Sequence, residues 1–471
     1  MSNTQPDVWE KRWNAFERIL PLEREGAEAR GDSKPYARYD TLKSLRQCLY
    51  VFGRSHYDFF KSGFEGDEGL HLEPSSEYPK EYVLNTILQQ ISFDLDVMAR
   101  AAHFRLPSAA PQLRETLNKA DILAYTALQP AIDAKLLAET TVVTYFQKSV
   151  SVRLMPYAPV ALIGIPFSAI DSPRDLLAIP HEVGHYIYRH GILQDSQHIG
   201  TRFEALLANQ LAGRPQWLLN WVEEIFADVY GCLVAGPVIA LSFQDLQAEC
   251  SLQDFISEDG EHPTPALRPN VYHHALKHTN LCASATQALE NNWTKYLATR
   301  PVLGPLKFSG KDVAGQTVNV DQVNTEIAGV IDLIMNKHLN SLLNSNRSGA
   351  HSQNSVWKWD DLANGEAVEH LYDKFTARVK ALPSTVDGAV PELLIAGEKG
   401  DAKMRLEMPK ADNSVKPIER KPGATGLWID ALKASKGNGQ PLTMPAEIWT
   451  AFLSGNGWAI EGPGGGNIHG T

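Results

Sequence analysis

Cysteine is scarce in this chain, which contains four cysteines in 471 residues. Cys48, Cys232, Cys250 and Cys282 lie far apart and form no CxxC pair. Structural zinc sites and small disulfide-stapled domains usually need cysteines at short, regular spacings. We therefore predict reduced thiols packed in a hydrophobic core, rather than disulfides or metal ligands.

Long hydrophobic runs are also missing. The longest strongly apolar stretches are about residues 160–170 and 229–243, shorter than the roughly 18 residues that a membrane-spanning helix needs, and prolines interrupt both. The N-terminus, MSNTQPDVWEKRW, has no basic segment followed by an apolar core, so it does not resemble a secretory signal. These features predict a soluble, cytoplasmic protein without a membrane partner.

Excess positive charge is absent as well. The chain has 44 Lys and Arg against 55 Asp and Glu, a formal net charge of −11 with histidine neutral. Proteins that bind phosphate backbones rely on clustered Lys and Arg, so nucleic acid is not an expected partner. The chain also lacks GxSxG, GxxxxGK[ST] and GxGxxG motifs. This removes the usual signatures of serine hydrolases, P-loop proteins and dinucleotide-binding domains.

Apolar spacing predicts that the first 148 residues form a helical N-terminal domain. In the clearest helix, apolar residues return to one face about every 3.6 residues. They are Leu84, Ile87, Leu88, Ile91, Leu95, Met98, Ala99 and Ala102. A second helix is expected from Pro111 towards Leu128.

The pattern changes near residue 149. Residues 149–153 and 159–165 are short and rich in Val, Ile and Leu, which is typical of strands. Ser172 and Pro173 suit the start of a helix that contains the segment HEVGH and ends near Gly191. Further helices are expected at 216–233 and about 323–342. The predicted fold class is α+β, with a helix-rich domain and a small sheet at residues 149–345.

The C-terminal part is expected to be a smaller region at residues 356–471. The polar, small residues at 344–355 predict a linker before it, and a helix is expected at about 365–381. The glycine-rich segment 462–466 predicts a flexible tail. We further expect a strand near 161–165 to form a sheet edge with which an extended peptide could pair.

The segment His181-Glu182-Val183-Gly184-His185 carries the strongest chemical signal. Residues i and i+4 share one helix face, so His181 and His185 can point at one ion, and neutral imidazole is a preferred zinc ligand. Glu182 is displaced by one residue, which places its carboxylate beside the ion. There it can act as a general base towards water.

A zinc site that keeps one position open needs a third protein ligand. His190 follows His185 by five residues and is expected to face away, and the cysteines have no suitable spacing. The best segment is WVEEIFAD at 221–228, where Glu224 and Asp228 are i and i+4 on a predicted helix. One carboxylate can bind the ion while the other orients a ligand histidine. Glu223 is the alternative, but it has no Asp four residues later.

HEVGH followed by EEIFADVYG resembles the gluzincin metallopeptidases, the thermolysin-like branch of the HExxH zinc enzymes. In that branch the third ligand comes from an ExxxD segment on a downstream helix. The resemblance covers roughly residues 150–280 and implies a zincin-like catalytic domain with one Zn²⁺ per chain. It implies that His181, His185 and Glu224 are ligands, that Glu182 is the base, and that Asp228 supports a ligand histidine.

A further stretch, EHPTPALR at 261–268, is similar to a His-Pro…Arg segment in soluble domains of CAAX-processing and heat-shock metallopeptidases. A peptidase needs a hydrogen-bond donor aimed at the developing oxyanion. His262 and Arg268 are the candidates for this catalytic role, and Tyr272 is a weaker one. His273 and His274 are expected to be structural or solvent-facing.

Together these features predict a zinc-dependent peptidase that acts on a peptide or protein. The alternative is a zinc-stabilised binding or scaffold protein without catalysis, although the intact Glu182 argues against it, because a purely structural site needs no base and would have a fourth protein ligand. A helical interaction protein without metal is the remaining alternative.

Overall fold

The computed structural model describes the residues on which the fold and the site depend. These are residues 8–19, 36–65, 79–155, 157–193, 201–300, 304–308, 313–343, 355–396, 405–409 and 415–418. The linker predicted at 344–355, except Ser355, and the tail predicted at 462–466 lie outside them.

The fold is α+β and rich in helices, as predicted. The N-terminal helices are α1 (Val8–Ile19), α3 (Tyr39–Glu65), α4 (Lys80–His103) and α5 (Pro111–Asp133). Both helices predicted from apolar spacing are present, as α4 and α5. In α4 the buried side includes Leu84, Ile87, Ile91 and Met98, the face that the periodicity indicated.

A three-stranded sheet forms the centre of the molecule, with strand order β1-β3-β2. The strands are β1 (Thr141–Gln147), β2 (Ser151–Arg153) and β3 (Val160–Pro166); β1 and β3 are parallel, and β2 is antiparallel to β3. The prediction that the strand near 161–165 lies at a sheet edge is therefore wrong. That strand is central, because a further strand, β1, pairs along its other side. The open edge next to the predicted site belongs to β2.

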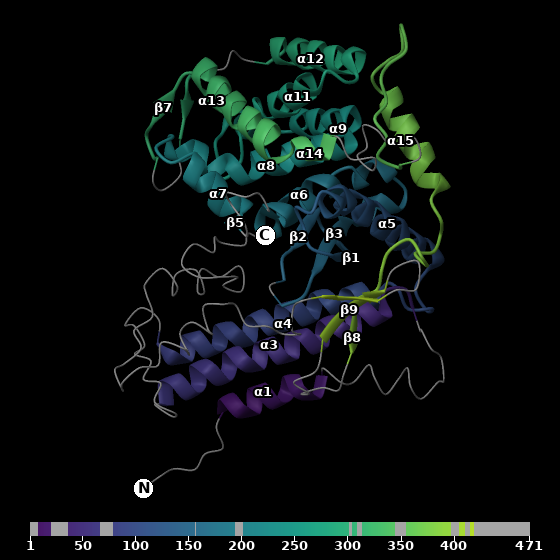
Figure 1. The fold of residues 1–471 in the computed structure, drawn as a ribbon. Coiled ribbons are helices and arrows are strands. Elements are labelled where there is room, and N and C mark those ends of the chain that lie inside the picture. Colours follow the sequence, from purple (N-terminus) through teal and green to yellow (C-terminus); the bar gives the residue numbers. More distant parts are fainter. Residues whose placement is uncertain are drawn as a thin grey trace.

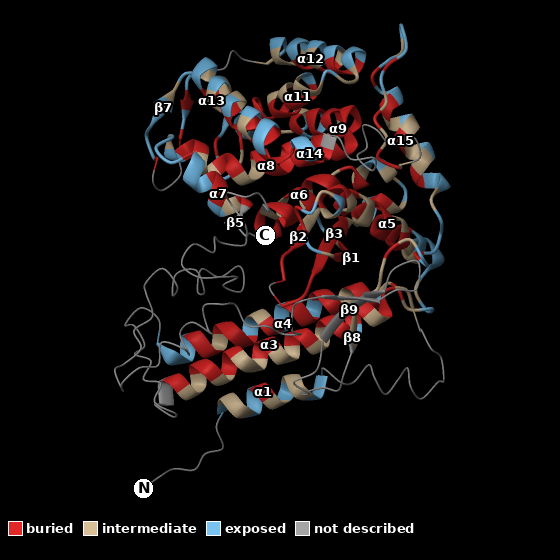
Figure 2. Cartoon of the chain, viewed as in Figure 1, coloured by how far each residue is buried: buried red, intermediate tan, exposed pale blue. Residues whose placement is uncertain are grey.

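Both faces of the sheet are buried, each against a different hydrophobic core. Side chains alternate along a strand, so Ala161 and Ile163 face one core while Val160 and Leu162 face the other. The first core contains α5, α6 (Ile179–His190) and α8 (Gln216–Ala235), and the second contains α3 and α4. Figure 1 shows these two groups of helices on opposite sides of the sheet, and Figure 2 shows the strands and the inward helix faces as buried.

The helix predicted to start at Ser172 is two separate elements. A short 3₁₀ helix, η3 (Pro173–Leu176), comes first, and α6 begins at Ile179 with Pro180 in its first turn. Proline has no N–H and its ring clashes with the carbonyl four residues earlier, so it suits a new helix start and not a helix interior. Ser172 makes no side-chain capping hydrogen bond. The predicted end at Gly191 is confirmed.

The remaining helices lie mainly around the first core, whereas β8 and its partner β9 lie beside α3 and the second core. The helices are η2 (Phe167–Ile170), α7 (Phe203–Gln210), α9 (Pro237–Ala248), α10 (Leu252–Ile256), α11 (Arg268–Thr279), α12 (Ala283–Ala298), α13 (Val320–Leu333), η4 (Ile334–His338), α14 (Asn340–Leu343) and α15 (His370–Ala381). The short strands are β4 (Ile192–Leu193), β5 (Thr201–Arg202), β6 (Leu306–Lys307), β7 (Thr317–Val318), β8 (Leu394–Ala396), β9 (Arg405–Pro409) and β10 (Val415–Ile418). The helix predicted at 365–381 begins later, at His370, because Gly365 lies in a turn with φ of +79°.

The hydrophobic cores cross the limits assigned to the domains from sequence. Helix α5 and strand β1, from before residue 149, share the first core with α6 and α8. Trp357 and Phe375, from the C-terminal region, are buried in the same core. Among the residues that the structure describes, no helix combines the length and apolar character needed to cross a bilayer.

Residues 390–393 connect the C-terminal region to the N-terminal helices. The buried Arg38 donates to the carbonyls of Val142 and Val390, and Leu393 is fully buried in the second core. The Leu393 carbonyl accepts a hydrogen bond from Ser44, and Glu392 accepts one from the amide of Thr41. A segment about 350 residues away in sequence thus completes the surface of α3.

Candidate metal centre

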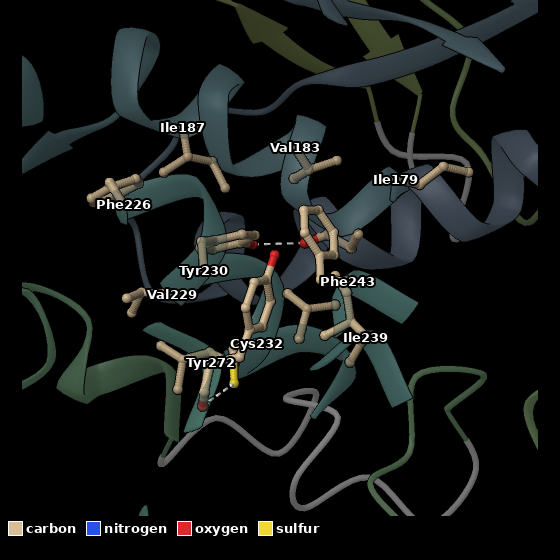
Figure 3. Close-up of a cluster of buried hydrophobic side chains, with 14 of the residues drawn as sticks. Ile179, Val183, Ile187, Phe226, Val229, Tyr230, Cys232, Ile239, Phe243 and Tyr272 are labelled. Atoms are coloured by element: carbon tan, nitrogen blue, oxygen red, sulfur yellow. Dashed lines mark hydrogen bonds between the residues drawn. The ribbon is translucent and has the colours of Figure 1, made fainter. Parts of the chain in front are cut away.

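The candidate centre lies where α6 crosses α8. The crossing is close because small residues meet there: a Cβ placed on Gly184 would lie 2.7 Å from Ala227 Cα, and one placed on Gly231 would lie 3.2 Å from the His181 nitrogen. Figure 3 shows part of the apolar cluster that the two helices share, with Ile179, Val183 and Ile187 of α6 and Phe226, Val229 and Tyr230 of α8. This packing leaves the two histidines of α6 on a different face, towards a cleft.

Three side chains bring one ligand atom each to a common point. His181 Nε2 and His185 Nε2 are 3.1 Å apart, Glu224 Oε1 is 3.3 Å from His185 Nε2, and Glu224 Oε2 is 3.5 Å from His181 Nε2. His181, His185 and Glu224 form the group of described residues that could hold a metal ion. The i, i+4 spacing on α6 supplies both imidazoles, and the close crossing of the helices brings in the carboxylate.

His181 is held by a buried polar cluster on α8 and α11. Its Nδ1 lies 2.8 Å from Asp228 Oδ1, which also accepts a hydrogen bond of 2.7 Å from the Tyr272 hydroxyl. Arg268 donates to both oxygens of Asp228, at 2.8 and 2.9 Å. A carboxylate on Nδ1 favours the tautomer that leaves the Nε2 lone pair pointing at an ion. Asp228 thus lies beside the ring nitrogen of His181 that faces away from the common point.

His185 has its own supporting carboxylate, Glu223. Glu223 Oε1 lies 3.2 Å from His185 Nδ1 and accepts a hydrogen bond of 3.1 Å from Arg189, which also donates to Glu204 at 2.7 Å. Glu223, the alternative ligand in the sequence, thus lies on the ring nitrogen that faces away from the common point. The roles of Arg189 and Glu204 were not predicted, because their contacts depend on how α6, α7 and α8 pack.

The carboxylates around His185 change its protonation. Burial alone would lower the His185 pKa, but Glu224 and the hydrogen bond to Glu223 outweigh burial and raise it to about 9. Burial would raise the Glu223 pKa, yet the hydrogen bond with His185 and the charge of Arg189 lower it to about 2. The pKa of Asp228 is likewise held well below its usual range by Arg268 and His181, against the effect of burial. Positively charged neighbours thus keep Glu223 and Asp228 ionised although burial favours their neutral forms.

The Arg268 guanidinium group contacts two carboxylates of the centre. Besides Asp228 it donates to Glu224 Oε2 at 2.7 Å, and its side chain is 10% exposed. It therefore pairs with two acids of the centre and also lines the cleft, so the oxyanion role expected from the sequence stays a prediction. Tyr272, the weaker candidate, is fully buried and donates to Asp228.

His262 lies at the open side of the centre. Its side chain is 39% exposed, its Nδ1 lies 2.8 Å from Asp259 Oδ2, and its Nε2 lies 3.4 Å from Glu224 Oε1. The contact with Asp259 and the charge of Glu224 overcome burial and raise the His262 pKa. Asp259 was missed in the sequence, although its spacing of three residues before His262 was a signal that could have been used.

The other histidines and the cysteines lie outside the three-residue group. His190 is buried beside Tyr186, with ring centroids 4.4 Å apart. His273 is buried against Gln244, and His274 pairs with Asp332. Cys48 and Cys232 are buried free thiols, and Cys250 and Cys282 are partly exposed free thiols. These positions agree with the structural roles predicted for the histidines and with the prediction of reduced thiols, although only two of the four are fully buried.

The centre opens into a cleft with a volume of about 1080 Å³. Glu182, His262 and the three candidate ligands line it, together with residues 149–152 and Leu154. Within the part of the chain that the structure describes, the Glu182 side chain has no hydrogen-bond or ion-pair partner. Its carboxylate is therefore available to a molecule in the cleft.

No protein-family model, curated protein or solved structure matches this chain. The resemblance to gluzincins therefore depends on the two short segments on α6 and α8 and on the geometry they adopt.

Proposed function

We propose that this protein is a zinc-dependent peptidase with its metal on His181, His185 and Glu224. The observation that carries the proposal is the convergence of two imidazole nitrogens and one carboxylate on a point that faces a cleft. Two nitrogen ligands and one oxygen ligand are a donor set typical of catalytic zinc. The carboxylates on both Nδ1 atoms fit such a site, because they orient the Nε2 atoms towards the ion.

The number of ligands favours catalysis over a structural role. Structural zinc sites are closed by four protein ligands, whereas catalytic sites keep one position for water or substrate. Among the described residues, the group that could hold a metal has three members. The zinc-stabilised scaffold, which is the alternative function, has no fourth ligand in this part of the chain.

The residues around the centre have separable tasks in peptide hydrolysis. A bound zinc ion would polarise the scissile carbonyl and lower the pKa of water to about 7. Glu182 takes a proton from the attacking water and delivers it to the leaving amine. His262, held by Asp259, donates a hydrogen bond to the developing oxyanion. The substrate lies along the open edge of β2 as an added strand.

Zinc content tests the metal site. Purified wild type should contain about one zinc per chain by elemental mass spectrometry, and Glu224→Ala should lose most of it, because removal of one of three ligands leaves an incomplete site. Glu249→Ala removes another carboxylate that lines the cleft but lies outside the ligand group, and it should keep its zinc. A folded wild type without zinc, even after incubation with the metal, would reject the site.

Peptide hydrolysis tests the activity itself. Incubation of the zinc-loaded protein with a mixed peptide library should give new peptide termini by mass spectrometry. A chelator should remove the activity and added zinc should restore it. If a stoichiometric zinc protein cleaves nothing in such a library, the scaffold function replaces the peptidase.

Zinc affinity should depend on pH in a defined direction. His185 is protonated below its pKa of about 9, so zinc must displace a proton near neutral pH. Affinity should therefore rise by up to about tenfold per pH unit from pH 7 and level off near pH 9. Calorimetry in buffers of different ionisation enthalpy should detect about one released proton per zinc at pH 7. An affinity that is constant over this range would contradict the contacts of His185.

A further inference from the structure

Strand β2 borders the cleft. Ser151 and Val152 of the strand line the cleft, together with residues 149 and 150 just before the strand and Leu154 just after it. Within the part of the chain that the structure describes, β2 pairs with β3 on one side and with no strand on the other. If the proposed function holds, this is the edge with which an extended peptide pairs.

This edge strand is short and needs support. Only Ser151, Val152 and Arg153 pair with β3, so β2 has few ladder hydrogen bonds of its own. Val152 and Leu154 pack into the first core, on the side of α6. Support on the opposite side must come from the intervening residue, Arg153.

Arg153 extends into the layer of N-terminal helices and ends on Asp94 of α4. Its Nε and Nη2 donate to Asp94 Oδ1 at 3.0 and 2.8 Å, and Nη2 also donates to Gln90 at 2.9 Å. The second oxygen of Asp94 accepts a hydrogen bond of 2.9 Å from the Tyr157 hydroxyl. Asp94 is fully buried and Arg153 is 5% exposed. The carboxylate thus holds both β2 and the chain that leads from β2 to β3.

The opposite edge strand, β1, has an equivalent buried pair. Arg105 donates to both oxygens of Asp121 on α5, at 2.8 and 2.7 Å, and to the carbonyl of Thr144 in β1 at 2.7 Å. Asp121 also accepts a hydrogen bond of 2.7 Å from the Thr144 amide. Strand β1 does not line the cleft. Each edge strand of the sheet thus contacts a buried Arg–Asp pair, and of these two strands β2 borders the cleft.

We propose that Asp94 is a positioning residue for substrate binding, which fixes the β2 edge through Arg153 and so makes the N-terminal helical layer part of the peptide-binding site. A buried ion pair contributes little net stability, because desolvation offsets the attraction of the charges. Its fixed hydrogen bonds do determine where the strand lies. This role depends on the proposed function, since it requires a peptide that pairs with β2.

Two double variants separate positioning from general stability. Asp94→Leu/Arg153→Met removes the pair behind β2, and Arg105→Met/Asp121→Leu removes the matched pair behind β1. Each is combined with Glu182→Gln to prevent hydrolysis and titrated into fluorescein-labelled casein, an unfolded polypeptide, by fluorescence anisotropy. The Asp94/Arg153 variant should bind casein at least about tenfold more weakly than its Glu182→Gln parent, the effect of losing a few strand hydrogen bonds. The Arg105/Asp121 variant should bind within about twofold, and both should keep their zinc.

Kinetics with Glu182 intact give a second readout. The Asp94/Arg153 variant should raise KM for casein about tenfold and leave kcat within about twofold, because the lost interaction is made equally in the bound and transition states. Faster deuterium exchange at residues 151–153, without a change in β1, should accompany it. If the double variant does not fold, Asp94→Asn and Asp121→Asn provide the same comparison with smaller changes.

The outcomes distinguish the two proposals. If the parent binds casein and both double variants bind equally well or equally badly, the role of Asp94 is rejected while the peptidase stands. If the Asp94/Arg153 variant loses its zinc and the Arg105/Asp121 variant does not, the role of Asp94 is also rejected. Asp94 would then act on the metal centre and not on the β2 edge. If the parent does not bind casein and the wild type cleaves no peptide, the peptidase function fails and the role of Asp94 fails with it.

Discussion

Glu182→Gln is expected to keep about one zinc per chain and to lose about 10²–10⁴-fold in turnover, the usual contribution of a general base. The amide keeps the size of the side chain but cannot take a proton from water. Glu182 lines the cleft and is not one of the three converging residues, so the metal site should be unaffected. Zinc content by elemental mass spectrometry and kcat on one peptide measure both effects.

The control for this variant is Glu249→Gln, which changes a carboxylate directly after α9, on another part of the cleft wall. It should retain both zinc and most of the turnover. Glu182→Gln with activity near that of the wild type would show that another group acts as the base. Loss of zinc from Glu182→Gln would instead mean that Glu182 is a ligand, which the geometry does not predict.

Gly184→Ala is expected to destabilise the protein, whereas an added methyl group in a helix normally stabilises it. The new Cβ would lie 2.7 Å from Ala227 Cα and 2.9 Å from the Ala227 carbonyl oxygen, and both are backbone atoms that cannot rotate away. Helices α6 and α8 must therefore separate, with a loss of about 1–3 kcal/mol in the free energy of unfolding. The separation also moves the two histidines away from Glu224, so zinc affinity should fall.

A matched substitution isolates this steric effect. Gly329→Ala lies on an exposed face of α13, where a Cβ would meet nothing within 4 Å. It should stabilise the protein by up to about 1 kcal/mol, because alanine favours the helix. Chemical unfolding of both variants, with zinc and with a chelator, measures the difference. A Gly184→Ala protein as stable as wild type would mean that the two helices do not cross this closely.

Local spacing predicted the parts of the fold that depend on local order. The sequence predicted helices α4 and α5, the strands β2 and β3 from their apolar, β-branched residues, and the helix end at Gly191. Strand β1 was not predicted, although its sequence TVVTYFQ is rich in β-branched and aromatic residues. Its omission also led to the wrong edge strand, because strand order depends on pairings between distant segments.

The candidate site also has one part that local spacing predicts and one part that depends on tertiary packing. The spacing of His181 and His185 on one helix is sufficient to bring both rings together. The choice between Glu223 and Glu224 depends on the angle at which α8 crosses α6, which sequence spacing does not determine. The position of Arg268 likewise depends on tertiary packing, because its partners Glu224 and Asp228 come from another helix. The sequence favoured Glu224 only because Asp228 follows it by four residues, and the resemblance to gluzincins implied the same ligand, which stays a prediction.

Residues 390–393 have a consequence for how the protein is made. During synthesis, α3 and α4 leave the ribosome long before residues 390–393 are made. Until then the Ser44 hydroxyl lacks its acceptor on Leu393, and the second core lacks the Leu393 side chain. Arg38, which donates to the carbonyls of Val142 and Val390, likewise lacks the second of these acceptors until Val390 is made. The first helices to be translated are thus among the last to reach their final packing. Nascent chains halted before residue 390 should be more sensitive to proteases in α3 than chains extended well beyond residue 393.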